Sequence, residues 1–220
     1  MRLALLVIAM AGCGFRSPGS SKPGVDAAVD DLDAAVDADA NPDVDAAVKI
    51  DAPAGFDPAT CPPSYDVTLP GFPQARYRII TGNAVFQSQH TACTVAGLSH
   101  LVALETALEL TELGTVLLPL TGPPTNGWYY VGAVQRPGQT APDAEWFWLV
   151  GGTVSSAAWG LFTTVVQPND ADDSEDNSEN LAVIDRAQGK LLDVTGTNGY
   201  GAVCECDGKS IIPTIAAYIP

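Results

Sequence analysis

Four cysteines constrain the fold of this 220-residue chain more than any other feature. They are Cys61, Cys93, Cys204 and Cys206, and the last two stand close together near the C-terminus. An even number of cysteines in an exported domain predicts two disulfides. Bridges from the C-terminal pair to Cys61 and Cys93 would tie both ends of one domain together. Each would close a long loop, which stabilises the fold by about 4 kcal/mol in the chain-entropy model.

The N-terminus indicates export. Arg2 precedes an apolar run at 3–9, followed by Met10-Ala11-Gly12-Cys13. This pattern is typical of a secretory signal, and a cysteine after Ala-Gly resembles the bacterial lipobox. We expect residues 1–12 to be removed, Cys13 to be lipidated, and the protein to be anchored to a bacterial membrane, at the cell surface or in the periplasm. The alternative is an ordinary signal peptide with a chance cysteine. No later segment is long and apolar enough to span a bilayer, so the lipid would be the membrane contact.

Residues 13–60 have the composition of a disordered linker. The block Val-Asp-Ala-Ala-Val occurs at 25–29 and 44–48, and ten aspartates lie between residues 26 and 57. Like charges repel and little apolar surface is available for burial, so the segment should stay extended. A calcium-binding repeat is the alternative, but the Gly-rich turns that make oxygens converge on an ion are missing. We interpret the segment as a stalk.

The charge balance excludes two classes of partner. The chain carries 26 acidic and 10 basic residues, a formal net charge of −16. Nucleic acids and anionic lipid surfaces each require a cationic face, so neither is expected as a partner. An acidic chain suits a solvated surface protein or one that binds cations.

The sequence contains little that indicates catalysis. It has no Gly-x-Ser-x-Gly motif and no histidine pair at metal-ligand spacing. Glu175 and Glu179 could in principle perform acid–base work on a glycoside, but a solvated loop is the simpler interpretation. We therefore expect a binding protein, not an enzyme.

The folded part is predicted to be an α+β domain over residues 61–208, followed by a tail at 209–220. Helical patterns cover 84–96 and 105–113, and residues 135–180 are rich in Gly, Pro, Trp and acids, as loops are. Short strands are predicted at 76–81, 101–104, 129–133, 181–184, 191–194 and 201–205.

The order of residues over 61–207 resembles the C-type lectin-like family. The landmarks are Phe86 seven residues before Cys93, Gly97-Leu98-Ser99-His100-Leu101-Val102, Glu109, Tyr130-Val131-Gly132-Ala133, Trp146 and Trp148 before Gly151-Gly152, Trp159, Gln167-Pro168-Asn169 and Val203-Cys204-Glu205. The resemblance implies two helices, short antiparallel sheets and a large long-loop region. It also implies Cys93–Cys204 as the core disulfide and Cys61–Cys206 as the N-terminal one. Leu181 and Gly196 stand where the family has a further bridge.

Sugar-binding members of the family use one calcium ion. Its ligands come from Glu-Pro-Asn or Gln-Pro-Asp, whose proline is cis, from a later Glu, and from the Asn and Asp of Trp-Asn-Asp; sugar hydroxyls complete the shell. The resemblance assigns both calcium and ligand binding to Gln167, Asn169, Glu179 and Asp193, with Trp159 as a stacking platform or as part of the core.

Two departures weaken this predicted site. Gln167-Pro168-Asn169 carries no carboxylate, and Leu192 replaces the Asn of Trp-Asn-Asp. Calcium affinity rises with ligand charge, so we expect a weak or degenerate Ca²⁺ site. Acids at 170–176 could substitute as ligands; alternatively they form a solvated loop.

These features predict an extracytoplasmic protein that recognises carbohydrate through a C-type lectin-like domain. The alternative is calcium-independent binding of a surface protein through the long loops, because the fold does not fix the function.

Overall fold

The computed structural model describes residues 52–95, 97–124, 126–170 and 178–218. The predicted signal peptide, Cys13, most of the linker and the acids at 171–177 lie outside the described residues. Residues 46–220 form one compact unit. In the part of the chain that the structure describes, the helices are too short or too polar to cross a membrane.

The described residues form an α+β domain with two main helices, as predicted. The helices are α1 (Phe86–Thr94) and α2 (Ala107–Leu117), with the short α4 (Pro213–Ala216) and the 3-10 turns η1 (Pro58–Thr60) and η2 (Ser156–Ala158). The strands are β1 (Val67–Leu69), β2 (Phe72–Ala84), β3 (Ser99–Leu101), β4 (Trp128–Gln135), β5 (Trp146–Trp148), β6 (Leu161–Phe162), β7 (Val165–Val166), β8 (Leu181–Asp185), β9 (Lys190–Val194) and β10 (Tyr200–Cys206).

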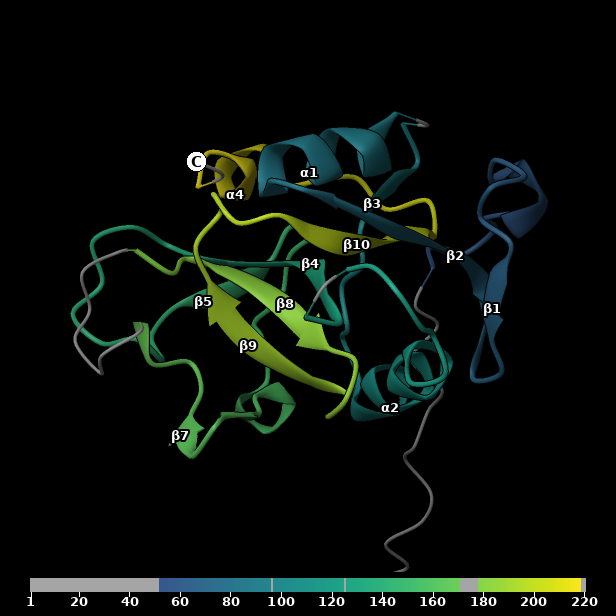
Figure 1. Cartoon of the computed structure of the whole chain (residues 1–220). Coiled ribbons are helices and arrows are strands. Elements are labelled where there is room, and N and C mark those ends of the chain that lie inside the picture. The colour runs from purple at the N-terminus through teal and green to yellow at the C-terminus, as the bar shows by residue number, and fades with distance from the viewer. Residues whose placement is uncertain (1–51, 96, 125, 171–177, 219–220) are drawn as a thin grey trace, which may run out of the picture. The chain divides into compact units, whose positions relative to one another are not determined.

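The main sheet runs in the order β1-β2-β10-β4-β8-β9, with β3 paired to β10 and β5 to β4. Strands β10 and β4 are parallel, and the other pairs are antiparallel. Figure 1 shows α1 above β10 and α2 below the sheet. Strands β6 and β7 form a separate hairpin, which belongs to the long-loop region between β5 and β8.

Both disulfides end on β10. Cys93–Cys204 joins it to α1 with the Cα atoms 5.2 Å apart, and Cys61–Cys206 joins it to the start of the domain at 6.0 Å. The pairing that the resemblance implied is thereby confirmed. Leu181, at a position of the family's further bridge, is buried and pairs with Val194 across β8 and β9, so apolar packing occupies that place.

The central strand β4 is buried on both faces. Tyr129 and Val131 pack in the cluster beneath α2, whereas Tyr130 and Val134 pack in the cluster beneath α1. Successive side chains of a strand point to opposite faces, so a strand covered on both sides needs apolar residues throughout. Gly132 is required for another reason: a Cβ there would lie 2.6 Å from the carbonyl oxygen of Leu101.

Helix α2 is fixed by hydrogen bonds at its first turn. The Thr106 hydroxyl accepts the Glu109 N–H at 3.1 Å, which caps the helix. The buried Glu109 carboxylate accepts the Tyr77 hydroxyl of β2 at 3.0 Å and the Glu105 N–H at 3.1 Å. A stripe of leucines at helical spacing then faces the core: Leu110, Leu113 and Leu117.

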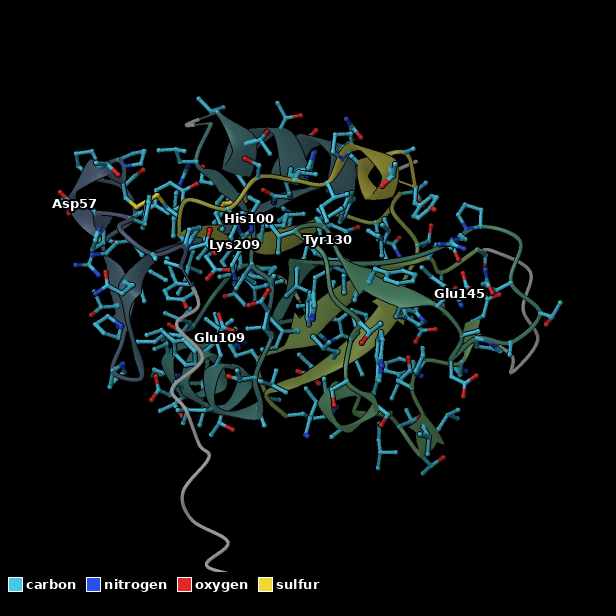
Figure 2. The ribbon with its side chains drawn as sticks, turned by 180° about the vertical axis from the view of Figure 1, so that it is seen from behind. Asp57, His100, Glu109, Tyr130, Glu145 and Lys209 are labelled. Carbon is cyan, nitrogen blue, oxygen red and sulfur yellow. A yellow bond between two sulfur atoms is a disulfide. The ribbon has the colours of Figure 1, made fainter. Side chains whose placement is uncertain are left out.

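A buried ion pair holds the end of β10 against β3. His100 Nε2 lies 2.9 Å from Asp207 Oδ1, and its Nδ1 lies 2.8 Å from the carbonyl oxygen of Leu101. Both partners are acceptors, which suits a ring protonated on both nitrogens. Lys209, drawn beside His100 in Figure 2, lies 3.3 Å from Asp207 Oδ2. Burial raises the pKa of Asp207, but its hydrogen bond to His100 and the charges of His100 and Lys209 outweigh burial and hold it below the ordinary value.

We expect Asp207→Ala to lower the free energy of unfolding by about 3–5 kcal/mol, because it leaves a buried charge without its partner. The control is Glu145→Ala: its ion pair with Arg136 is 43% and 47% exposed, so its loss should cost about 1 kcal/mol or less. Urea unfolding at neutral pH measures both, and equal costs would contradict this account. The difference between wild type and Asp207→Ala is complete above the unfolded aspartate pKa of about 3.9 and shrinks as the pH falls through the lower folded value.

Candidate functional site

The segment Gln167-Pro168-Asn169 follows the β6–β7 hairpin and turns into the domain. The Gln167–Pro168 peptide bond is cis. The side chains on either side of the proline are buried, with 5% of Gln167 and 7% of Asn169 exposed. They contact each other, because Gln167 Nε2 donates a hydrogen bond to Asn169 Oδ1.

Asp193 joins this segment to the main sheet. It lies on β9 opposite Ala182, and its Oδ2 accepts the backbone N–H groups of Asn169 at 2.8 Å and Asp170 at 2.7 Å. Its neighbour Leu192 packs in the core beneath α1, as alternation along the strand requires. Gln167, Asn169 and Asp193, three of the four predicted ligands, therefore form one buried amide–carboxylate cluster.

The electrostatics of Asp193 favour a cation. Burial raises the pKa of its carboxyl, backbone N–H donors lower it, and the charge of Asp170 raises it again; the net shift is upward. Its Oδ1 is buried and has no hydrogen-bond partner among the described residues. Because an unpaired buried carboxylate is costly, a bound cation would stabilise it.

The donor set fits calcium only weakly. Ca²⁺ takes about six to eight oxygen ligands and prefers carboxylates. The cluster brings one carboxylate and two amides, and Asp193 Oδ2 already accepts two N–H donors. The described side chains thus suit a weakly held ion whose other ligands would come from water or from a bound molecule.

Glu179, the fourth predicted ligand, is placed differently. Its N–H and the Ser178 hydroxyl both donate to Asp170 Oδ1 at 3.0 Å. Burial and the charge of Glu179 raise the pKa of Tyr200, against a hydrogen bond to Asn198 that lowers it. The described residues place the Glu179 backbone beside Asp170, whose own N–H donates to Asp193, and place the Glu179 charge near Tyr200.

A hollow of about 520 Å³ opens beside the cluster. Gln167, Pro168 and Asn169 line it together with Glu145, Trp146 and Trp159. Trp159 packs edge-on against Trp146, with ring centroids 4.7 Å apart. Trp146 is buried and Trp159 is half-buried, so Trp159 both extends the core and borders the hollow.

One buried amide shapes the loop that carries Glu145. Gln135, at the end of β4, directs Nε2 at the carbonyl oxygens of Ala141, Pro142 and Ala144 at 3.0–3.2 Å. The Trp146 indole N–H also donates to Pro142 at 2.8 Å. Sequence reasoning missed Gln135; its only signal was a polar residue that ends an otherwise apolar strand.

The backbone of this region is strained at selected places. Glu145, Thr163 and Asp170 adopt positive φ angles of 51°, 57° and 48°, a conformation that costs side-chain-bearing residues free energy. Two of the three, Glu145 and Asp170, lie at the hollow or directly after the cis-proline segment. Such strain persists only where the surrounding structure enforces it, so the loops are fixed by their neighbours.

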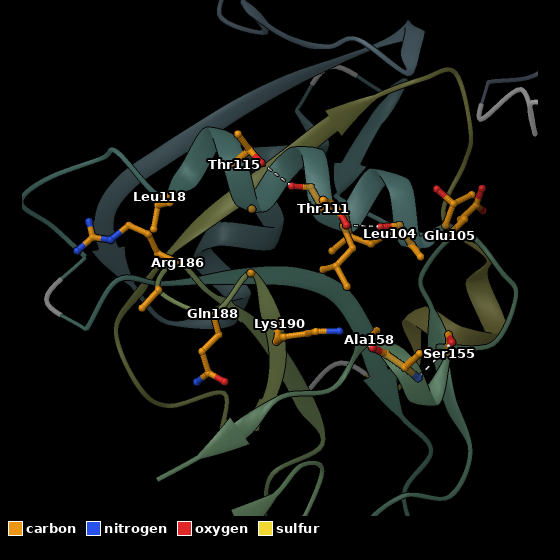
Figure 3. Close-up of a pocket in the computed structure, with 17 residues that line it drawn as sticks. Leu104, Glu105, Thr111, Thr115, Leu118, Ser155, Ala158, Arg186, Gln188 and Lys190 are labelled. Carbon is orange, nitrogen blue, oxygen red and sulfur yellow. Dashed lines mark hydrogen bonds between the residues drawn. The ribbon is translucent and has the colours of Figure 1, made fainter. Parts of the chain in front are cut away.

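A second hollow, of about 510 Å³, lies between α2 and residues 155–158 and 186–190 (Figure 3). Several of its polar groups are bonded within the domain. Lys190 Nζ donates to the Ala157 carbonyl at 2.7 Å, and the hydroxyls of Thr111 and Thr115 donate to helix carbonyls. Arg186 also lines this hollow, and its buried Nη1 has no hydrogen-bond partner among the described residues.

His100, Glu205 and Asp207 form a buried group whose candidate metal-ligand atoms lie within 4.8 Å of one another. His100 is already bonded at both ring nitrogens, and Glu205 Oε2 accepts the Ala103 N–H at 3.1 Å. The ammonium of Lys209 supplies positive charge beside Asp207. We interpret the group as a structural ion-pair network.

The Gln135→Leu substitution tests the loop architecture. It removes an amide donor shared by three partly buried carbonyls, two of which keep another N–H donor, at nearly constant volume. We therefore expect a loss of about 1–3 kcal/mol in urea unfolding. Tryptophan fluorescence should also become easier to quench as Trp146 loses its surroundings. The exposed Gln87→Leu on α1 is the matched control and should stay within about 0.5 kcal/mol of wild type. A silent Gln135→Leu would refute the role assigned to this amide.

Solved structures with a similar fold include C-type lectin domains. The carbohydrate-recognition domain of the mouse scavenger receptor C-type lectin is 19% identical, with a TM-score of 0.52, and the match covers 68% of this chain and 99% of the other. The C-type lectin CEL-I from Cucumaria echinata is 16% identical, with a TM-score of 0.50 and 66% and 96% covered. Human lithostathine is 16% identical, with a TM-score of 0.51 and 72% and 99% covered.

Comparison by sequence adds nothing to this, since no protein-family model and no curated protein matches the chain. At identities of 16–19%, the structural likeness establishes the fold. The helices, the mostly antiparallel sheet and the disulfide pairing agree with it. The described residues therefore have the C-type lectin-like fold.

Proposed function

We propose that this protein binds carbohydrate at the amide–carboxylate cluster of Gln167, Asn169 and Asp193, with a weakly held calcium ion as an aid. One observation carries the proposal: amide and carboxylate groups are buried together around a cis-proline, beside a hollow bordered by tryptophan. Burial of unpaired polar groups is costly, so their clustering at an open hollow favours a polar ligand.

The chemistry of the cluster suits sugar hydroxyls. An amide both donates and accepts, and a carboxylate accepts, so neighbouring hydroxyl groups would find complementary partners. Trp159 offers an apolar face for a sugar ring at the border of the hollow. Calcium, when bound, would polarise and orient hydroxyl groups that share its coordination shell. With one carboxylate, we expect a dissociation constant on the order of 1 mM, as in other weak extracellular calcium modules.

Proteins with a similar structure support the same class of ligand. Two of them are carbohydrate-recognition domains of scavenger receptor C-type lectins. The signal-like N-terminus and the acidic linker support an exported protein held on a stalk by lipid at Cys13, where a glycan of the surroundings would be accessible. The chemistry is binding without turnover.

Calcium-independent recognition of a surface protein is the second candidate. Leu192, in place of a ligand Asn, is 1% exposed and belongs to the core, so it supplies no oxygen. The β6–β7 hairpin beside the hollow exposes Leu161, Phe162 and Val166 by 47%, 49% and 70%. Exposed apolar groups of this kind favour contact with another protein.

Asn169→Ala distinguishes the two candidates. It removes an amide of the cluster while the N–H that bonds Asp193 remains, so glycan affinity should fall by about tenfold, the effect of a lost hydrogen bond in a polar site. A glycan array followed by titration of the best binder measures this, with exposed Gln87→Ala as control. Glycan binding that is unchanged in Asn169→Ala, or absent from the wild type, would favour the protein-binding alternative.

Calcium affinity should depend on pH through Asp193. Its raised pKa means that the proton competes with the ion at a higher pH than for an ordinary aspartate of about 3.9. Apparent affinity therefore falls as the pH drops from neutral toward that raised value. Titration calorimetry across this range checks the trend. Asp193→Asn should abolish both calcium binding and its pH dependence, whereas the exposed Asp66→Asn should change neither.

A further inference from the structure

The chain beyond the last disulfide returns to the long-loop region. After Cys206 it passes Lys209 and reaches the loop that follows β5, where the Ile212 N–H donates to the Leu149 carbonyl at 2.8 Å. Helix α4 (Figure 1) then turns the chain, which is exposed at Pro213, Thr214 and Ala217 and partly buried again at Ala216 and Tyr218. We call residues 211–218 the C-terminal clasp.

The first contact of the clasp requires a glycine beneath it. A Cβ on Gly151 would lie 2.7 Å from the Ile212 side chain. Gly151 also has a φ of +103°, which residues with a side chain rarely adopt. The turn after β5 is thus shaped to receive Ile212, and Ile211 packs against the core cluster beneath α1.

The second contact reaches the wall of the hollow through Arg136. The Arg136 guanidinium lies 5.7 Å from the Tyr218 ring and 5.6 Å from the Phe147 ring. The same group forms an ion pair with Glu145 at 3.0 Å. Glu145 borders the hollow and adopts a positive φ, so its position depends on such external contacts.

We propose that the C-terminal clasp positions the 141–150 loop, and with it the Glu145 carboxylate, at the candidate binding site. Tyr218 acts through Arg136, and Ile212 acts through the Leu149–Gly151 turn. Tyr218, Arg136 and Ile212 are positioning residues. The effect on ligand binding rests on the proposed function, whereas the effect on the loop does not.

Hydrogen–deuterium exchange on the full, unliganded chain tests the proposal. Tyr218→Ala should raise exchange in residues 141–150 by about two- to fivefold, the change expected for one cation–π contact at an exposed site. A chain that ends at Ser210 should raise it by about tenfold or more, because a hydrogen bond and apolar contacts are also lost. Exchange over α2, residues 107–117, which packs in the other core cluster, serves as the internal reference and should not change.

Two further variants make the result specific. Tyr218→Phe keeps the ring and should restore wild-type exchange, and Thr214→Ala, on the exposed side of α4, should have no effect. If the shortened chain fails to fold, the point variants carry the test. Unchanged exchange at 141–150 in Tyr218→Ala, or an equal rise over 107–117, would overturn the proposal. A wild type that binds no glycan, but whose loop still responds to Tyr218→Ala, would refute the proposed function and leave the clasp intact.

Discussion

Both disulfides end on β10, which pairs with β2, β3 and β4 and holds the buried Asp207 directly after its last residue. The cross-links close loops of 111 and 145 residues in sequence separation, and closing loops of that length limits the entropy of the unfolded chain strongly. With β10 fixed in this way, β4 pairs with it and β8 pairs with β4. The residues between β5 and β8 can therefore be mostly loops, and the domain still keeps its core.

The candidate binding region depends on buried polar side chains that bond the backbone of its loops. Asp193 fixes the cis-proline segment by accepting two backbone N–H groups, and Gln135 fixes the opposite loop by donating to three carbonyls. Each group satisfies backbone atoms that an irregular loop would otherwise leave unpaired. Asp193 Oδ1 has no hydrogen-bond partner among the described residues. Asp193 also carries a negative charge, which Gln135 does not, so it is the candidate ligand for a cation. Asp193 and Gln135 therefore both stabilise the loops and shape the candidate site.

Sequence reasoning identified those parts of the fold that local pattern and cysteine spacing determine. The helices and the fold class were predictable from helical periodicity and the order of elements, and the even cysteine count predicted two disulfides. Which cysteines pair was predictable only through the family resemblance. The grouping of Gln167, Asn169 and Asp193 was predictable only through resemblance, because β9 and the cis-proline segment meet through the tertiary fold. The role of Gln135 depends on three carbonyls of a loop whose shape has no sequence signature. The clasp was equally hidden, because Ile211, Ile212 and Tyr218 are too few for a periodic pattern and Pro213 interrupts them.

The most direct test of the central claim is thermal unfolding of the full chain, with both disulfides intact, in EDTA and across a calcium titration. A ligand that binds only the native state raises the melting temperature with its concentration. For a site centred on Asp193, we predict a saturable rise of about 3–6 °C at tenfold excess over the dissociation constant, which Asp193→Asn abolishes and Asp66→Asn retains. A melting temperature that stays constant up to calcium concentrations about tenfold above the expected millimolar constant would contradict the claim that this cluster holds a cation.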